Sequence, residues 1–167
     1  ALDDALAADA YALRIDDQVR IAGGSPHGVA LGAATVVQIA VAIHDRITLP
    51  CVSIEDAPEL PYRGVLLDVA RFRHDIALLR TVVALCWLNK VGALHLHLSD
   101  DQSFTFPSRS LPKLASIDRD GSRRQYTHDE LRELVAYADA RGVIVVPEID
   151  VPGHSAVMAR AYPELFG

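Results

Sequence analysis

The sequence predicts an α/β fold, a partial (β/α)8 TIM barrel limited to its first three βα units and preceded by the end of a small α+β domain. Three short apolar runs, starting at Gly64, Ala93 and Val143, support this prediction. Each is too brief for a helix, suits a strand, and ends close to polar residues. Helical patterns separate the runs, which is typical of a parallel sheet with a polar pocket at the carboxyl ends of its strands.

The composition indicates a globular protein. Half of the 167 residues are hydrophobic and 23% are charged, so the chain is long and apolar enough to bury a core. The net charge of −6 without a basic cluster disfavours a nucleic-acid or anionic-membrane surface. No stretch reads as a membrane span or a signal peptide, and no compartment is indicated. Cys51 and Cys86 have no metal or redox spacing, and Cys86 is expected to be a buried thiol in a helix.

Residues 1–57 are predicted to be the C-terminal part of the small α+β domain, and residues 58–167 the first part of the barrel. The alternation of polar and apolar residues predicts strands over 10–15 and 19–24, joined in a hairpin.

A helix is expected after this hairpin. Ser25 can serve as its N-cap with Pro26 at the first helical position, and the apolar stretch 29–43 continues it. The proline-punctuated stretch 50–61 is then expected to connect the two domains.

Two more helices are predicted between the barrel strands. Asp75 can cap the first, which ends at Gly92. Thr127 and Glu130 form a capping box at the start of the second, which ends at Gly142. The residues expected to form the apolar stripe of the first helix are Ile76, Leu79, Val83 and Cys86.

Carboxylates gather where the predicted strands end. Asp100 and Asp101 follow the second strand, and Glu148 and Asp150 end the third, two residues apart and therefore on one side. Paired carboxylates suit glycoside hydrolysis, in which one protonates the leaving oxygen and another stabilises positive charge. The alternative is that these groups only cap helices and pin loops.

The histidines allow a second type of site. His95 and His97 share a face of their strand, and with His154 they could bind a metal, which needs three or four ligands. The preferred interpretation is that these histidines are polar residues in the interior of a barrel, so no metal is predicted. Arg63, directly before the first strand, could bind a polyhydroxylated ligand or form a surface ion pair. Trp87 is expected to pack rather than to stack on a sugar.

Three motifs in this order resemble the family 20 glycoside hydrolases, the β-N-acetylhexosaminidases and chitobiases. They are RGVLLDVAR at 63–71, LHLHLSDD at 94–101 and PEIDVPGH at 147–154. Tyr126-Thr127 and AYPEL at 161–165 are also typical of this family, and SIEDAP at 53–58 is similar to its link between the small domain and the barrel.

The resemblance implies an activity. Such enzymes remove terminal β-linked N-acetylglucosamine or N-acetylgalactosamine from glycans and chitin fragments with retention. The acetamido oxygen of the sugar attacks the anomeric carbon, which departs from the usual two-carboxylate scheme. No metal or organic cofactor is implied, and the expected partner is an N-acetylhexosamine-terminated glycan or chitooligosaccharide.

The resemblance also implies roles for residues. Arg63 and Asp100 are expected to bind the substrate, with Arg63 on sugar hydroxyls far from the scissile bond. His154 is expected to support the catalytic carboxylates, together with Asp150 and Glu148. We expect Arg63, Asp100 and His154 to converge on one rim of the barrel.

The chain departs from the family pattern in two respects, because it lacks the catalytic Asp-Glu pair and the aromatic residues from later strands that wall the acetamido pocket. The catalytic Asp-Glu pair, which the family places after its fourth strand, is expected beyond Gly167. The chain is therefore interpreted as the N-terminal portion of such an enzyme, inactive alone. Three parallel strands leave unpaired edges, so we expect it to associate with the remainder of the barrel or with itself. The alternatives are a metal-dependent TIM-barrel hydrolase and a non-catalytic carbohydrate-binding remnant.

Overall fold

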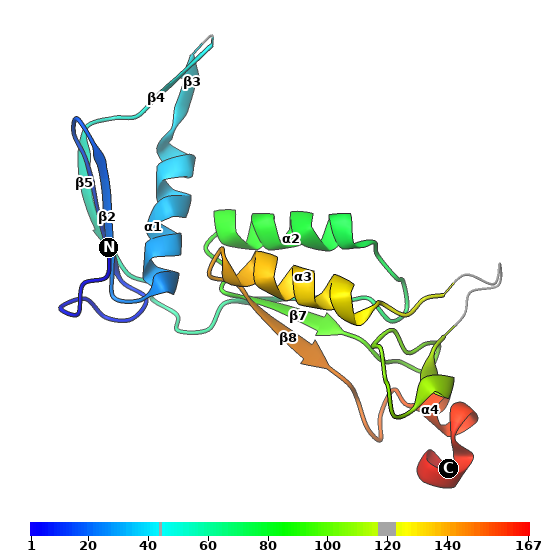
Figure 1. The fold of residues 1–167 in the computed structure, drawn as a ribbon. Coiled ribbons are helices and arrows are strands. Elements are labelled where there is room, and N and C mark those ends of the chain that lie inside the picture. The colour runs from blue at the N-terminus through cyan, green and yellow to red at the C-terminus, as the bar shows by residue number, and fades with distance from the viewer. Residues whose placement is uncertain (44, 117–122) are drawn as a thin grey trace.

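The computed structural model describes residues 1–43, 45–116 and 123–167 and contains one antiparallel and one parallel three-stranded sheet (Figure 1). The antiparallel sheet comes first in the chain and has the order β2-β1-β5. The parallel sheet has the order β6-β7-β8. The α/β class and the partial barrel predicted from the sequence are confirmed.

The antiparallel sheet contains the predicted hairpin of β1 (Tyr11–Ile15) and β2 (Val19–Gly23). Helix α1 (Pro26–Ile39) packs on this sheet and starts as predicted, because the Ser25 side chain accepts a hydrogen bond from the Gly28 amide. The core between helix and sheet is built from Tyr11, Leu13, Ile15 and Leu31.

The helix prediction over 29–43 was too long. Helix α1 ends at Ile39, and β3 (Val41–Ile43) pairs with β4 (Arg46–Thr48) in a second hairpin. Figure 1 shows this hairpin projecting beyond the end of α1. β-branched side chains such as Val41 favour a strand over a helix.

The stretch 50–61 is more than a connector. It contains β5 (Val52–Asp56), which pairs antiparallel with the free edge of β1. Val52 and Ile54 alternate with polar residues, and this strand signal was obscured by the flanking prolines. Among the described residues the antiparallel sheet therefore has three strands.

The parallel sheet follows the predicted βα rhythm. Its strands are β6 (Gly64–Asp68), β7 (Ala93–His97) and β8 (Ile144–Glu148), with β7 in the centre. Helices α2 (Ile76–Leu88) and α3 (His128–Asp139) link the strands.

The side chains of β7 alternate between two environments. Leu94, Leu96 and the following Leu98 are buried in a core shared with the helices. Because successive side chains of a strand point to opposite faces, His95 and His97 face away from the helices. In a closed barrel that face is the interior.

The starts of α2 and α3 agree with the sequence, but both helices end before the predicted glycines, α3 at Asp139 rather than Gly142. The Asp75 carboxylate accepts from the Leu78 amide, and the capping box of Thr127 and Glu130 is complete. Helix α2, however, ends before the predicted Gly92, because the chain leaves it through Lys90 in a left-handed conformation with φ of 57°.

A smaller apolar cluster holds the long segment after β7 against the end of the chain. It involves the 3-10 turn Pro112–Leu114 and the short helices α4 (Ala156–Ala161) and α5 (Pro163–Phe166). Its buried members are Phe104, Leu114, Met158 and Tyr162. Among the helices of the described residues, none has the length and apolarity needed to cross a bilayer.

The antiparallel sheet and α1 contact the parallel sheet at the amino ends of its strands. Trp87 packs at this junction, as predicted, and Cys86 is buried as predicted. The connecting contacts are Trp87 Nε1 to Ala30 O at 2.9 Å, Gln38 Nε2 to Leu88 O at 2.6 Å, His27 Nδ1 to Gly142 O at 2.6 Å, and Lys90 Nζ to Asp56 Oδ2 at 2.9 Å.

Among the described residues, each outer strand of the parallel sheet has one edge without a neighbouring strand. Leu66 on β6 is 55% exposed and Ile144 on β8 is 68% exposed, whereas most of β7 is buried. Both outer strands therefore have an unpaired edge among the described residues.

Candidate functional site

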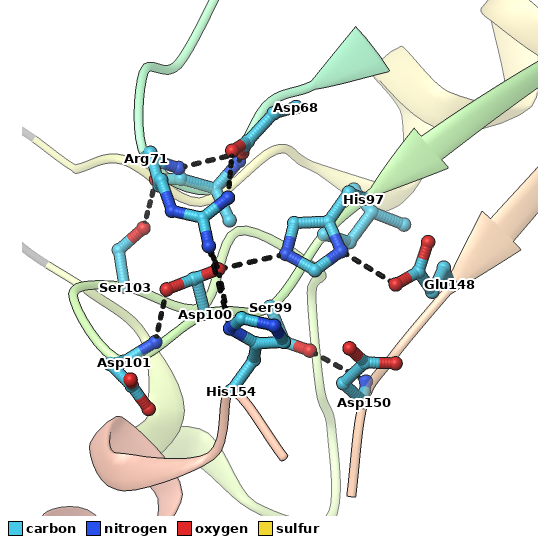
Figure 2. Close-up of polar contacts among 12 residues, drawn as sticks. Asp68, Arg71, His97, Ser99, Asp100, Asp101, Ser103, Glu148, Asp150 and His154 are labelled. Atoms are coloured by element: carbon cyan, nitrogen blue, oxygen red, sulfur yellow. Dashed lines mark hydrogen bonds and ion pairs between the residues drawn. The ribbon is translucent and has the colours of Figure 1, made fainter. Parts of the chain in front are cut away.

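The register of the parallel sheet places three polar side chains in one row. Asp68, His97 and Glu148 are the last residues of their strands and are paired across the sheet. The segments that follow the strands bring Arg71 and Asp100 to the same row, and Figure 2 shows the resulting cluster. Carboxyl ends of parallel strands are where functional sites of such folds are found.

Asp100 lies at the centre of this cluster and is 1% exposed. Its Oδ2 is 2.5 Å from an Arg71 nitrogen, 3.0 Å from His97 Nε2 and 3.2 Å from His154 Nδ1. Its Oδ1 accepts from the Asp101 amide at 2.7 Å. Burial alone would raise the pKa of Asp100, but the hydrogen bond from His97 and the neighbouring positive charges outweigh it, so its pKa lies below the ordinary value.

Arg71 is held between two carboxylates. Asp68 Oδ1 accepts from the amides of Ala70 and Arg71, and its Oδ2 accepts from the Arg71 guanidinium at 2.6 Å. A second guanidinium nitrogen faces Asp100. The side chain of Arg71 is 47% exposed, and a guanidinium has five N–H donors, so donors remain for a ligand.

His97 bridges two strand ends. Its Nε2 faces Asp100 at 3.0 Å and its Nδ1 faces Glu148 Oε1 at 2.7 Å. Burial would lower the pKa of His97, but the two carboxylates overcome it and raise the pKa above the ordinary value. The pKa of Glu148 is lowered, because the contact with His97 outweighs its own burial. His95 Nε2 lies 2.5 Å from the other oxygen of Glu148.

The structure brings together four of the five residues predicted for the site. Asp100, His154 and Glu148 belong to the cluster described above. Asp150 has a carboxylate oxygen close to His97 and Glu148, and its amide donates to Ser99 Oγ at 2.9 Å. Their roles in binding and catalysis stay predictions.

The prediction that Arg63 shares this rim was wrong. Arg63 precedes β6 and therefore lies at the amino ends of the strands, opposite the cluster. Its guanidinium donates to the backbone oxygens of Lys90 at 2.8 Å and Leu60 at 2.6 Å. Through these contacts Arg63 links the two segments that lead into β6 and β7.

Sequence reasoning missed Asp68 and Arg71 as members of the site. Both lie in the first motif, and both come at or after the end of β6, whereas Arg63 comes before its start. The direction of the strand was the available signal, because residues after parallel strands meet at one edge.

The alternative of a three-histidine metal site is not supported by the arrangement. Three sets of side chains lie close enough to share an ion, but His95 belongs to none of them. His97 faces a carboxylate through each ring nitrogen, and a nitrogen that donates a proton to a carboxylate has no lone pair for a metal. Arg71 already provides a positive charge to Asp68 and Asp100.

Comparisons with known proteins match both parts of the chain. The model for the catalytic domain of glycosyl hydrolase family 20 matches residues 60–167, and the model for domain 2 of that family matches residues 1–57. A beta-hexosaminidase from Akkermansia muciniphila is 39% identical over 96% of the chain and 35% of that protein. A beta-hexosaminidase from Vibrio furnissii is 33% identical over 93% of the chain and 28% of that protein.

A solved structure supports the same likeness. The GH20 exo β-N-acetylglucosaminidase from Vibrio harveyi, in complex with N-acetylglucosamine, superimposes with a TM-score of 0.87 and 31% identity. The match covers 99% of the present chain and 29% of that protein. The chain thus spans roughly a third or less of the length of these similar proteins.

Proposed function

The chain belongs to glycosyl hydrolase family 20, and on that basis we propose that the full-length protein is a glycoside hydrolase acting on terminal β-linked N-acetylhexosamine. The substrate would be a glycan or a chitooligosaccharide. The names of the similar proteins support this substrate class, and the polar cluster at the carboxyl ends of β6, β7 and β8 supports a binding site for a polyhydroxylated ring. We also propose the division into a small domain over 1–57 and a barrel from residue 58.

The observation that carries the proposal is the fixed guanidinium of Arg71. Asp68 and Asp100 orient it from two sides while almost half of the side chain stays accessible. An oriented guanidinium donates to two adjacent hydroxyl groups in a defined geometry. The sugar-binding role first expected of Arg63 is therefore assigned to Arg71. Because Asp100 is 1% exposed, it would act on the sugar through Arg71 rather than by direct contact.

The proposed mechanism rests on the family resemblance. The acetamido oxygen of the substrate would attack the anomeric carbon with overall retention, in place of a protein nucleophile. An Asp-Glu pair outside these 167 residues would orient the acetamido group and transfer the proton. His154 and Asp150 would support that pair from the rim described above. A matched β-glucoside, which lacks the acetamido group, should then not be hydrolysed.

The proposal is tested by turnover of a fluorogenic N-acetyl-β-glucosaminide by the full-length protein. Arg71→Lys keeps the charge but removes the planar fork, and we expect kcat/KM to fall about 10- to 100-fold. Arg132→Lys is the matched control, because Arg132 is an exposed surface residue paired with Asp129. A fall of less than about twofold for Arg71→Lys would contradict its role.

Two other outcomes would favour the alternatives. Binding of N-acetylglucosamine without turnover would favour a carbohydrate-binding protein, and stoichiometric zinc would favour a metal-dependent hydrolase. We further propose that the 167-residue polypeptide alone is inactive, since among its described residues β6 and β8 each have an edge without a neighbouring strand. Turnover by that polypeptide would refute this statement.

A further inference from the structure

Imidazoles and carboxylates alternate along a line through the cluster. His154 contacts Asp100 at 3.2 Å, Asp100 contacts His97 at 3.0 Å, His97 contacts Glu148 at 2.7 Å, and Glu148 contacts His95 at 2.5 Å. Figure 2 shows the line from His154 to Glu148. Its middle members, Asp100 and His97, are buried, whereas the side chain of His154 is 46% exposed.

The position of His97 fixes its charge. A neutral imidazole has one N–H and one lone pair, so it would turn the lone pair towards one of the two carboxylates. A protonated imidazole donates to both. His97 contacts Asp100 and Glu148 through its two different nitrogens, and both carboxylates have pKa values below their ordinary range. The raised pKa of His97 agrees with this geometry.

We propose that His97 is a positioning residue, a buried imidazolium that holds Asp100 in place and thereby fixes Arg71 and His154. Asp100 uses a single oxygen, Oδ2, to contact all three of these side chains. If His97 became neutral, one of its two contacts would be lost and Asp100 could turn away from Arg71. The kinetic part of this inference rests on the proposed function, whereas the charge of His97 does not.

The charges around His97 favour its protonated form. Carboxylates from all three strand ends face it, and the neighbouring positive groups come from the segments after β6 and β8. The titratable and charged groups around it are Asp68 and Arg71 after β6, His95 and Asp100 on or after β7, Glu148 and Asp150 at the end of β8, and His154. Four of these groups are carboxylates, which are negative when ionised, whereas one, Arg71, carries a permanent positive charge.

The charge is measured by a pH titration of the 15N-histidine-labelled full-length protein, observed by NMR. We expect both nitrogens of His97 to show imidazolium shifts above pH 6.5, the ordinary histidine value. Glu148→Gln should move this transition down by about one pH unit. Asp129→Asn is the matched control, because it removes a carboxylate charge from an exposed side chain that is not among the groups around His97. A transition at or below pH 6.5, or one that Glu148→Gln leaves unmoved in a folded protein, would overturn the inference.

The positioning role is measured by the pH profile of kcat/KM on the fluorogenic N-acetyl-β-glucosaminide. We expect the alkaline limb to move down in Glu148→Gln by the same amount as the His97 transition, and His97→Gln to lower kcat/KM at least about tenfold. An alkaline limb that stays in place while the NMR transition moves would show that His97 has no part in positioning. Absence of turnover in the unmutated protein would refute the proposed function and leave the NMR result valid by itself.

Discussion

Replacement of Asp100 by asparagine should reveal how much the buried cluster contributes to stability. Asparagine keeps the shape of the side chain but removes the charge that faces Arg71, His97 and His154. The neighbouring carboxylate provides a matched control, Asp101→Asn, because Asp101 is exposed.

The expected magnitude follows from burial. Removing one partner of a buried ion pair costs about 3–5 kcal/mol, and a hydrogen bond to a charged group contributes about 1.5–3 kcal/mol. Arg71 and His154 are about half exposed, so water screens much of what they would lose. His97 is buried and would lose one of the two carboxylates that contact its ring nitrogens, while it keeps Glu148. We therefore expect Asp100→Asn to lower the free energy of unfolding by about 2–3 kcal/mol, and Asp101→Asn by less than about 1 kcal/mol.

The difference should depend on pH with a definite sign. The pKa of Asp100 is lowered in the folded protein, so its contribution is present above pH 3.8 and is lost as the pH falls through the folded pKa. The pKa of His97 is raised, so its contribution is present below pH 6.5 and is lost as the pH rises through the folded pKa. The gap between the unmutated protein and Asp100→Asn should be widest between these limits.

Urea denaturation of the full-length protein at a pH of about 5.5 measures this gap, and the same measurement near neutral and acidic pH gives its dependence. Equal losses for Asp100→Asn and Asp101→Asn, or a gap that does not change with pH, would refute the charge-based reasoning.

Three further outcomes are expected from other parts of the fold. Leu96→Ala should cost about 2–5 kcal/mol in urea denaturation, because this side chain is 1% exposed in the core of the parallel sheet. Trp87→Phe should cost about 1 kcal/mol through the lost hydrogen bond to Ala30, with sugar binding in calorimetry unchanged because the polar cluster lies at the opposite ends of the strands. Burial raises the pKa of Tyr126 to about 12, so an absorbance titration should show one tyrosine ionising late, and stability should fall as the pH rises from 10 towards 12.

Local signals in the sequence were sufficient for the starts of α1, α2 and α3 and for the parallel strands. Ser25, Asp75 and the pair Thr127 and Glu130 satisfy free backbone amides by themselves, so the starts of the helices depend little on distant contacts. The strand β5 depends instead on its pairing with β1, 37 or more residues away, and the prolines that flank it pointed to a loop. The pairing with a distant strand, and not the local sequence pattern, therefore determines that this stretch is a strand.

Most carboxylates of the cluster were singled out from the sequence, whereas Asp68 and Arg71 were missed. Asp100, Glu148 and His154 were singled out because each lies at or after the carboxyl end of a strand. Arg63 and Arg71 lie at the two ends of one motif, and the choice between them depends on which end of the sheet forms the pocket. The bridging contacts of His97 arise from the register of three strands, which no single stretch of sequence contains.

The junction with the antiparallel sheet lies at the opposite end of the strands from the polar cluster. The contacts of Trp87 and Lys90 are therefore separated from the polar cluster by the length of the sheet, so changes at these two residues can alter the junction without changing the cluster. Residues at one end of this sheet can therefore be substituted without changing the contacts at the other end.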